Sequence, residues 1–246
     1  MAILLVTALS FLQHRAASSG DGPDHASAAP AGPDYSFLRV NPSGTPTRWN
    51  PCQAIHFRTN LAEAPPAAAA DLGAAIGQVS SATGLTFVDD GSTTVIPTKA
   101  YESGANGHHP VVIAWATPAQ TDVLAPGALD RALGAVREVG VGGASAVIDP
   151  VTGHGVYVSG LVVIDPVASA GLNPGFGPHS IGVVLMHELG HLVGLGHTTA
   201  SDEIMNPVVQ TTKDGSWGPG DMAGLARLGV GSGCLSVPKR RTVLIY

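Results

Sequence analysis

Charged side chains are scarce in this 246-residue chain, where Asp, Glu, Lys and Arg together make up 12% of the residues. The net charge is −6, and the basic residues are scattered apart from the Lys239–Arg241 run, which argues against a polyanionic partner. Aromatic residues are also few, at 5%, and the three tryptophans lie too far apart in the sequence to form a base-stacking surface. We therefore expect no nucleic-acid binding.

No hydrophobic run is long enough to span a bilayer. The apolar run Ala2–Leu12 has the length of a signal-peptide core, but no basic residue precedes it, so residues 1–15 are predicted to be either a signal peptide or a truncated membrane anchor. Residues 16–34 have the Ala, Ser, Gly, Pro and Asp composition of a disordered linker. We expect an exported protein with one folded domain at 35–238 and a basic, apolar tail at 239–246.

Cysteine is nearly absent: Cys52 and Cys234 lie near opposite ends of the expected domain. In an exported chain, two such residues most simply form one disulfide. That bond would close a loop of about 180 residues and stabilise the fold by about 5 kcal/mol at most in the chain-entropy model. Two separate buried thiols are the alternative interpretation.

Several motifs of common enzyme classes are also missing. The sequence has no G-x-S-x-G nucleophile motif, no P-loop and no dinucleotide-binding fingerprint. The glycines at Gly140–Gly143 lack the context of a phosphate-binding loop, so we expect them to serve bends or close packing of a strand. These absences argue against nucleotide chemistry and against a serine hydrolase of that type.

The apolar pattern that is present predicts a single α+β domain, close to α/β in character, with a twisted, mixed five-stranded sheet. Alternating and continuous apolar runs predict strands, and i, i+3, i+4 spacing predicts helices, of which the first ends at Gly84. The expected strands lie within 47–60, 85–91, 110–116, 139–149 and 155–165, and the expected helices lie at 66–83, after Ser180 as N-cap, and after Gly220-Asp221.

The most informative stretch is HELGHLVGLGH at 187–197. His187 and His191 are four residues apart, so a helix places both imidazoles on one face, where they can share a zinc ion. Glu188 is rotated about 100° from His187 on that helix. It is therefore predicted to act on a water at the metal as a general base rather than to be a ligand.

Gly194 explains how a third histidine could join this pair. A helix continued past Gly194 would carry His197 too far along its axis to reach the same metal ion. Glycine tolerates the positive φ that ends a helix and turns the chain back. Three neutral imidazoles leave one coordination position for water, which is the arrangement of a catalytic zinc site.

HELGHLVGLGH resembles the metzincin zinc motif HExxHxxGxxH. Metzincins also have a methionine in a tight turn below the zinc, and Met205 lies in TTASDEIMNP, eight residues after His197. That spacing resembles the matrixin branch, as do RWNPC upstream and GDMAGLARLG downstream. Residues 35–235 thus look like a bacterial, secreted matrixin-like domain, and the resemblance implies a metzincin fold with an active-site helix and a C-terminal helix.

The resemblance also implies a function. It implies a monomeric zinc endopeptidase that hydrolyses peptide bonds of extracellular proteins, with one catalytic zinc ion and a zinc-bound water activated by Glu188. An extended substrate would pair with an edge strand above the cleft, which we place at Gly143, Ala144, Ser145, Ala146 and Val147. The segment from Asn206 to Trp217 would form the wall of the pocket for the residue after the cut.

The chain also departs from the animal matrixins. His108, His109, His154 and His179 do not reproduce their second zinc site, and nothing in the sequence supports a calcium site, although Asp149 and Asp165 carry suitable oxygens. A PRCGxPD cysteine switch is absent. Two other functions remain open at this point: a binding protein that keeps the fold without turnover, and a zinc hydrolase of a non-protein amide or ester.

Overall fold

We analysed a computed structural model of the chain, which describes residues 34–99, 101, 109–124, 139–208, 214–238 and 242–244. The predicted signal or anchor segment and nearly all of the predicted linker lie outside these residues. His108 and residues 209–213 of the predicted pocket wall also lie outside them.

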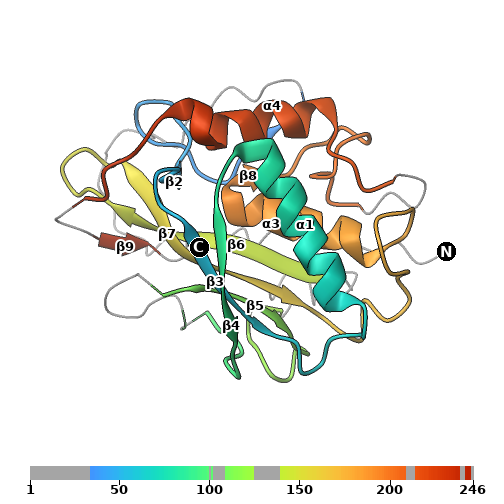
Figure 1. Ribbon diagram of the computed structural model, residues 1–246. Coiled ribbons are helices and arrows are strands. Elements are labelled where there is room, and N and C mark those ends of the chain that lie inside the picture. Colours follow the sequence, from blue (N-terminus) through green and yellow to red (C-terminus); the bar gives the residue numbers. More distant parts are fainter. Residues whose placement is uncertain are drawn as a thin grey trace, which may run out of the picture.

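A mixed sheet forms the centre of the domain (Figure 1). Its strands run in the order β4-β3-β5-β7-β6-β9, and the short β2 pairs with β7 beside this path. All pairs are parallel except those that β6 makes with β7 and with β9. The strands are β2 (Arg48–Trp49), β3 (Ile55–Asn60), β4 (Phe87–Ser92), β5 (Val111–Trp115), β6 (Gly140–Ile148), β7 (Gly155–Ile164) and β9 (Thr242–Leu244).

The helices include α1 (Ala68–Thr83), α3 (Ile181–Val193) and α4 (Pro219–Leu228), with a short 3-10 turn, η2 (Val230–Ser232), after α4. Helix α1 ends at Gly84, whose φ of 72° lets its N–H bond to Ser80 O. Helices α1 and α3 contact each other and lie on one side of the sheet, with α4 across their ends (Figure 1). Pro219 begins α4 three residues earlier than predicted, because proline suits the first helical turn.

Side chains alternate between the two faces of β6. Ala144, Ala146 and Ile148 join the main core with α1 and α3, whereas Val141 packs in a smaller cluster on the opposite face. That smaller cluster consists of Ala116, Val123, Leu124, Val141, Leu161 and Val163. The strand is therefore covered on both faces, and the small residues of its core face let α3 approach closely.

The expected fold class is confirmed, but the strand count is not: the sheet has seven strands in the part of the chain described, rather than five. The five predicted strands are β3 to β7. The additional strands, β2 and β9, have two and three residues, too few to show a periodic pattern. Strand β9 lies in the segment that the sequence predicted to be a tail.

Cys52 and Cys234 are joined by a disulfide with a Cα–Cα distance of 5.5 Å. The bond ties the turn after β2 to the segment after η2, and Arg48 supports the same junction by donating to Ser232 O and Gly233 O at 2.7 and 2.8 Å. Among the described residues, no helix is both long and apolar enough to cross a membrane.

Candidate active site

Helix α3 carries the first two histidines of the motif through the centre of the domain. Every residue from Ile181 to Val193 is buried, which is the pattern of a helix enclosed on all sides. The helix ends at Gly194, where a φ of 118° directs the N–H to Gly190 O and His191 O. The chain then turns back through β8 (Leu195–Gly196) and brings His197 beneath the helix.

The three histidines of this segment converge on one point. The Nε2 atoms of His187 and His191 are 3.0 Å apart, and each lies 3.2 Å from His197 Nε2. Three ligands of a tetrahedral zinc ion at about 2.0–2.1 Å would be separated by about 3.3–3.4 Å. The observed spacing is close to this value, so these three imidazoles fit a single metal ion.

Backbone carbonyls fix the tautomers of the two helical histidines. His187 Nδ1 donates to Ile204 O at 2.7 Å, and His191 Nδ1 donates to Leu195 O at 2.7 Å. A carbonyl oxygen can only accept, so the proton of each neutral ring is on Nδ1 and the lone pair is on Nε2. Both Nε2 lone pairs therefore point at the site where a cation would lie.

The electrostatics of the site keep these rings neutral. Burial lowers the pKa of His187 to about 3, with a further lowering from His197, against the opposing effect of the Ile204 hydrogen bond. Burial also lowers the pKa of His197 to about 4 and that of His191 well below its usual value. At neutral pH all three are unprotonated, as metal ligands must be.

Glu188 lies where α3 is nearest to β6, and its side chain is fully buried. A Cβ added at Gly140 would lie 3.0 Å from both Glu188 Cγ and Glu188 Oε1. A Cβ added at Gly142 would overlap the Glu188 carbonyl oxygen and lie 2.9 Å from its Cα. The glycines of β6 thus give α3 room at the residue beside the first histidine, which agrees with the close strand packing expected from the sequence.

A turn around Met205 closes the site from below. A Cβ added at Gly190 would lie 2.5 Å from Met205 Sδ, so the sulfur packs directly against the backbone of α3. The turn also holds the chain after the third histidine, because Thr198 N donates to Met205 O at 3.1 Å. Met205 itself is completely buried.

Two acidic residues hold this turn against α4. The Asp221 carboxylate accepts from Ile204 N at 2.6 Å and from Met205 N at 3.3 Å. Glu203 in turn accepts from Gly220 N and Asp221 N at 2.9 and 2.7 Å. Burial raises the pKa of Asp221 to about 7, and the neighbouring Glu203 raises it too, against the backbone hydrogen bonds.

The family model of the matrixins, Peptidase_M10, matches residues 173–228. This range contains the three converging histidines, the Met205 turn and α4. Over these residues the chain is similar to the matrixins, a branch of the metzincins. No curated protein matches it. Together, the family and the three-histidine site support a zinc metallopeptidase.

The structure also places residues of this matrixin-like chain that the sequence analysis did not single out. Ser36 Oγ donates to His197 O at 2.7 Å, from the strand β1 (Ser36–Phe37), which pairs with β8. Its contact spans 161 residues of sequence, and no local pattern could have revealed it. Asp221, in contrast, is visible as an acidic residue in the first turn of a predicted helix, although its partners are not.

The predicted substrate strand lies within β6. Gly143 to Val147 pair with β7 on one side. On the other side, Ala146 and Val147 pair with Leu244 and Val243 of β9, whereas Gly143, Ala144 and Ser145 have no second strand partner in the part of the chain described. All nine residues of β6 are buried.

Proposed function

We propose that this chain is a secreted zinc-dependent endopeptidase that hydrolyses peptide bonds of extracellular proteins. The observation that carries this proposal is the convergence of the neutral imidazoles of His187, His191 and His197 on one point, with the buried Glu188 next to His187 in helix α3. A zinc ion held by His187, His191 and His197 would serve as a Lewis acid for the substrate carbonyl and for water. The disulfide and the predicted signal segment support an oxidising, extracellular compartment.

Glu188 is proposed as the general base. It follows His187 in the helix, so its carboxylate lies beside the site without joining the three nitrogen ligands. In this position it would accept a proton from the attacking water at a carboxylate oxygen and then donate that proton to the leaving amine nitrogen. Packing against Gly140 and Gly142 would hold the carboxylate in place for both transfers.

The remaining expectations stay part of the proposal. A folded domain at 35–238, preceded by an export segment and a linker, would act as a monomer. Met205 would support the histidines from below, and an extended substrate would pair with β6 at Gly143–Val147.

The test is hydrolysis of casein by the purified chain and by its Glu188→Ala variant, with zinc content measured on both. We expect the parent to cleave, the variant to lose activity by a factor of at least about 100, and both to hold one zinc ion. A parent that binds no zinc would show that the three imidazoles are not a zinc site. Zinc in both proteins without cleavage by either would contradict a general peptidase.

A second candidate that the sequence leaves open is a zinc hydrolase of a small non-protein amide or ester. An N-acylated amino acid amide, assayed beside casein, separates the two. Cleavage of the small amide alone would favour this second function.

A further inference from the structure

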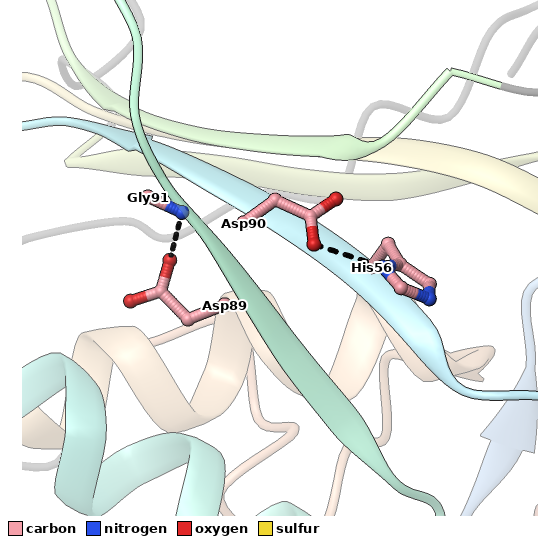
Figure 2. Close-up of polar contacts among 4 residues, drawn as sticks. All are labelled: His56, Asp89, Asp90 and Gly91. Atoms are coloured by element: carbon pink, nitrogen blue, oxygen red, sulfur yellow. Dashed lines mark hydrogen bonds and ion pairs between the residues drawn. The ribbon is translucent and has the colours of Figure 1, made fainter.

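The two outer edges of the central sheet differ in their capacity to accept another strand. At one edge, β4 carries Asp89 and Asp90, and Gly91 has a φ of 90° where the pairing with β3 shifts register. Asp90 is hydrogen-bonded to His56 at 2.9 Å, and Asp89 accepts from the Gly91 N–H at 2.8 Å. Figure 2 draws both contacts. Charged residues and bulges of this kind protect an edge from strand addition.

The opposite edge, formed by β6, carries no charged side chain, although its pairing with β7 also shifts register, between Ser145 and Ala146. Its sequence, GVGGASAVI, contains no charged residue and no proline. Such a strand readily accepts another chain through its backbone hydrogen bonds. In the structure part of this edge is already occupied, because β9 pairs with it antiparallel over Ala146–Ile148.

Strand β9 runs along β6 toward the end of β6 that contacts Glu188. Its register places Thr242 opposite Ile148 and Leu244 opposite Ala146, so β9 runs toward the Gly140 end of β6. That end is the one in contact with Glu188 through Gly140 and Gly142. Ala146 and Gly142 are four residue steps apart along the strand, or about 13 Å at 3.3 Å per residue. A peptide on the same path would therefore reach the backbone beside Glu188.

We propose that β9 is an internal competitor for the peptide-binding edge of β6. It occupies the part of the edge that would hold substrate residues upstream of the cut, in the direction that a substrate would take toward Glu188. An extended peptide must displace β9 to pair along the full strand. This inference rests on the proposed peptidase function for its consequence, whereas the competition itself concerns only β6, β9 and a peptide.

The test weakens β9 in the full chain by Val243→Pro, which removes a backbone donor and disfavours a strand. Val243→Thr is the matched control, because it keeps the N–H group and the preference for a strand. Binding is measured by fluorescence anisotropy with a fluorescein-labelled synthetic peptide of the chain's residues 240–246. All proteins carry Glu188→Gln in this assay so that the peptide is not cleaved.

We expect the Val243→Pro protein to bind the peptide roughly tenfold more tightly than the parent, since the loss of one or two net strand hydrogen bonds has an effect of that order. The Val243→Thr protein should bind like the parent. Equal zinc content and equal melting temperatures would exclude misfolding as the cause. Equal affinity of the parent and the Val243→Pro protein would overturn the proposal.

Cleavage assays with Glu188 restored separate this inference from the peptidase function. If both inferences hold, Val243→Pro lowers the KM for casein roughly tenfold and leaves kcat unchanged. Cleavage with the same KM in both proteins would overturn competition by β9 and leave the peptidase function standing. Tighter peptide binding without cleavage by any zinc-loaded protein would support the competition and refute the peptidase function.

Discussion

Gly142→Ala should separate the catalytic helix from the sheet. The new Cβ would lie 2.8 Å from the carbonyl carbon of Glu188 and 2.9 Å from its Cα. Carbon atoms in favourable contact are about 3.5–4.0 Å apart, so the deficit is roughly 1 Å. Both contacted atoms belong to the backbone of α3 and cannot rotate away. The strand or the helix must therefore move by about that amount.

A displacement of about 1 Å at a catalytic group can lower a rate by roughly 100-fold. We therefore expect kcat on casein to fall roughly 100-fold, with zinc content retained and stability reduced by about 1–3 kcal/mol from overpacking. Steady-state kinetics, metal analysis and urea unfolding measure these three effects. The change should fall mainly on kcat, because Gly142 lies at the Glu188 end of β6 rather than under β9.

Two other glycine-to-alanine variants serve as controls for Gly142→Ala. Gly77→Ala introduces a Cβ into open space on α1 and should leave kcat unchanged. Gly140→Ala brings a Cβ to 2.9 Å from Ile164 Cδ1 and to 3.0 Å from Glu188 Cγ and Oε1, which are side-chain rather than backbone atoms, so kcat should fall less than in Gly142→Ala. A folded, zinc-loaded Gly142→Ala protein with the kcat of the parent would refute the reasoning.

Three further predictions follow from the site and its supports. Because the pKa values of His187 and His197 are lowered to about 3 and 4, the folded metal-free protein binds fewer protons than the unfolded chain below about pH 6.5. The free energy of unfolding should therefore fall as the pH drops from about 6.5 toward 4, by about 1.4 kcal/mol per pH unit for each of these two histidines. A urea midpoint that stays constant over this pH range would contradict the lowered pKa values. Asp221→Ala leaves the buried N–H groups of Ile204 and Met205 without their acceptor. The substitution should lower the free energy of unfolding, measured in urea, by about 2–5 kcal/mol. A loss below about 0.5 kcal/mol would show that water replaces the carboxylate. Replacing Cys52 and Cys234 together by serine should cost about 2–5 kcal/mol in the same assay, and an unchanged midpoint would show that the junction is held by other contacts.

The parts of the site that could be predicted from sequence are those that depend on local geometry. The helical period predicts that His187 and His191 lie on one face of a helix. The positive φ that glycine tolerates predicts that this helix ends at Gly194. The core strands were visible for the same reason, since β3, β5 and β7 show strand patterns within a few residues.

The remaining parts depend on contacts between distant segments. The packing of Gly142 against Glu188 is set by where the sheet meets the helix, and a glycine in a strand pattern indicates only that some close approach exists. The strand β9 has three residues, and its pairing depends on the open edge of β6 rather than on any periodicity of its own.

The hydrogen bond from Ser36 to His197 has a consequence for how the metal site assembles. Two imidazoles are in place as soon as one helical turn forms, because they are neighbours in sequence. The third is held by a strand from the other end of the domain, so its position depends on closure of a loop of 161 residues, a slow, non-local step. Tight metal binding would therefore mark the completion of folding, and a metal-sensitive probe added during refolding would report when the two ends of the domain meet.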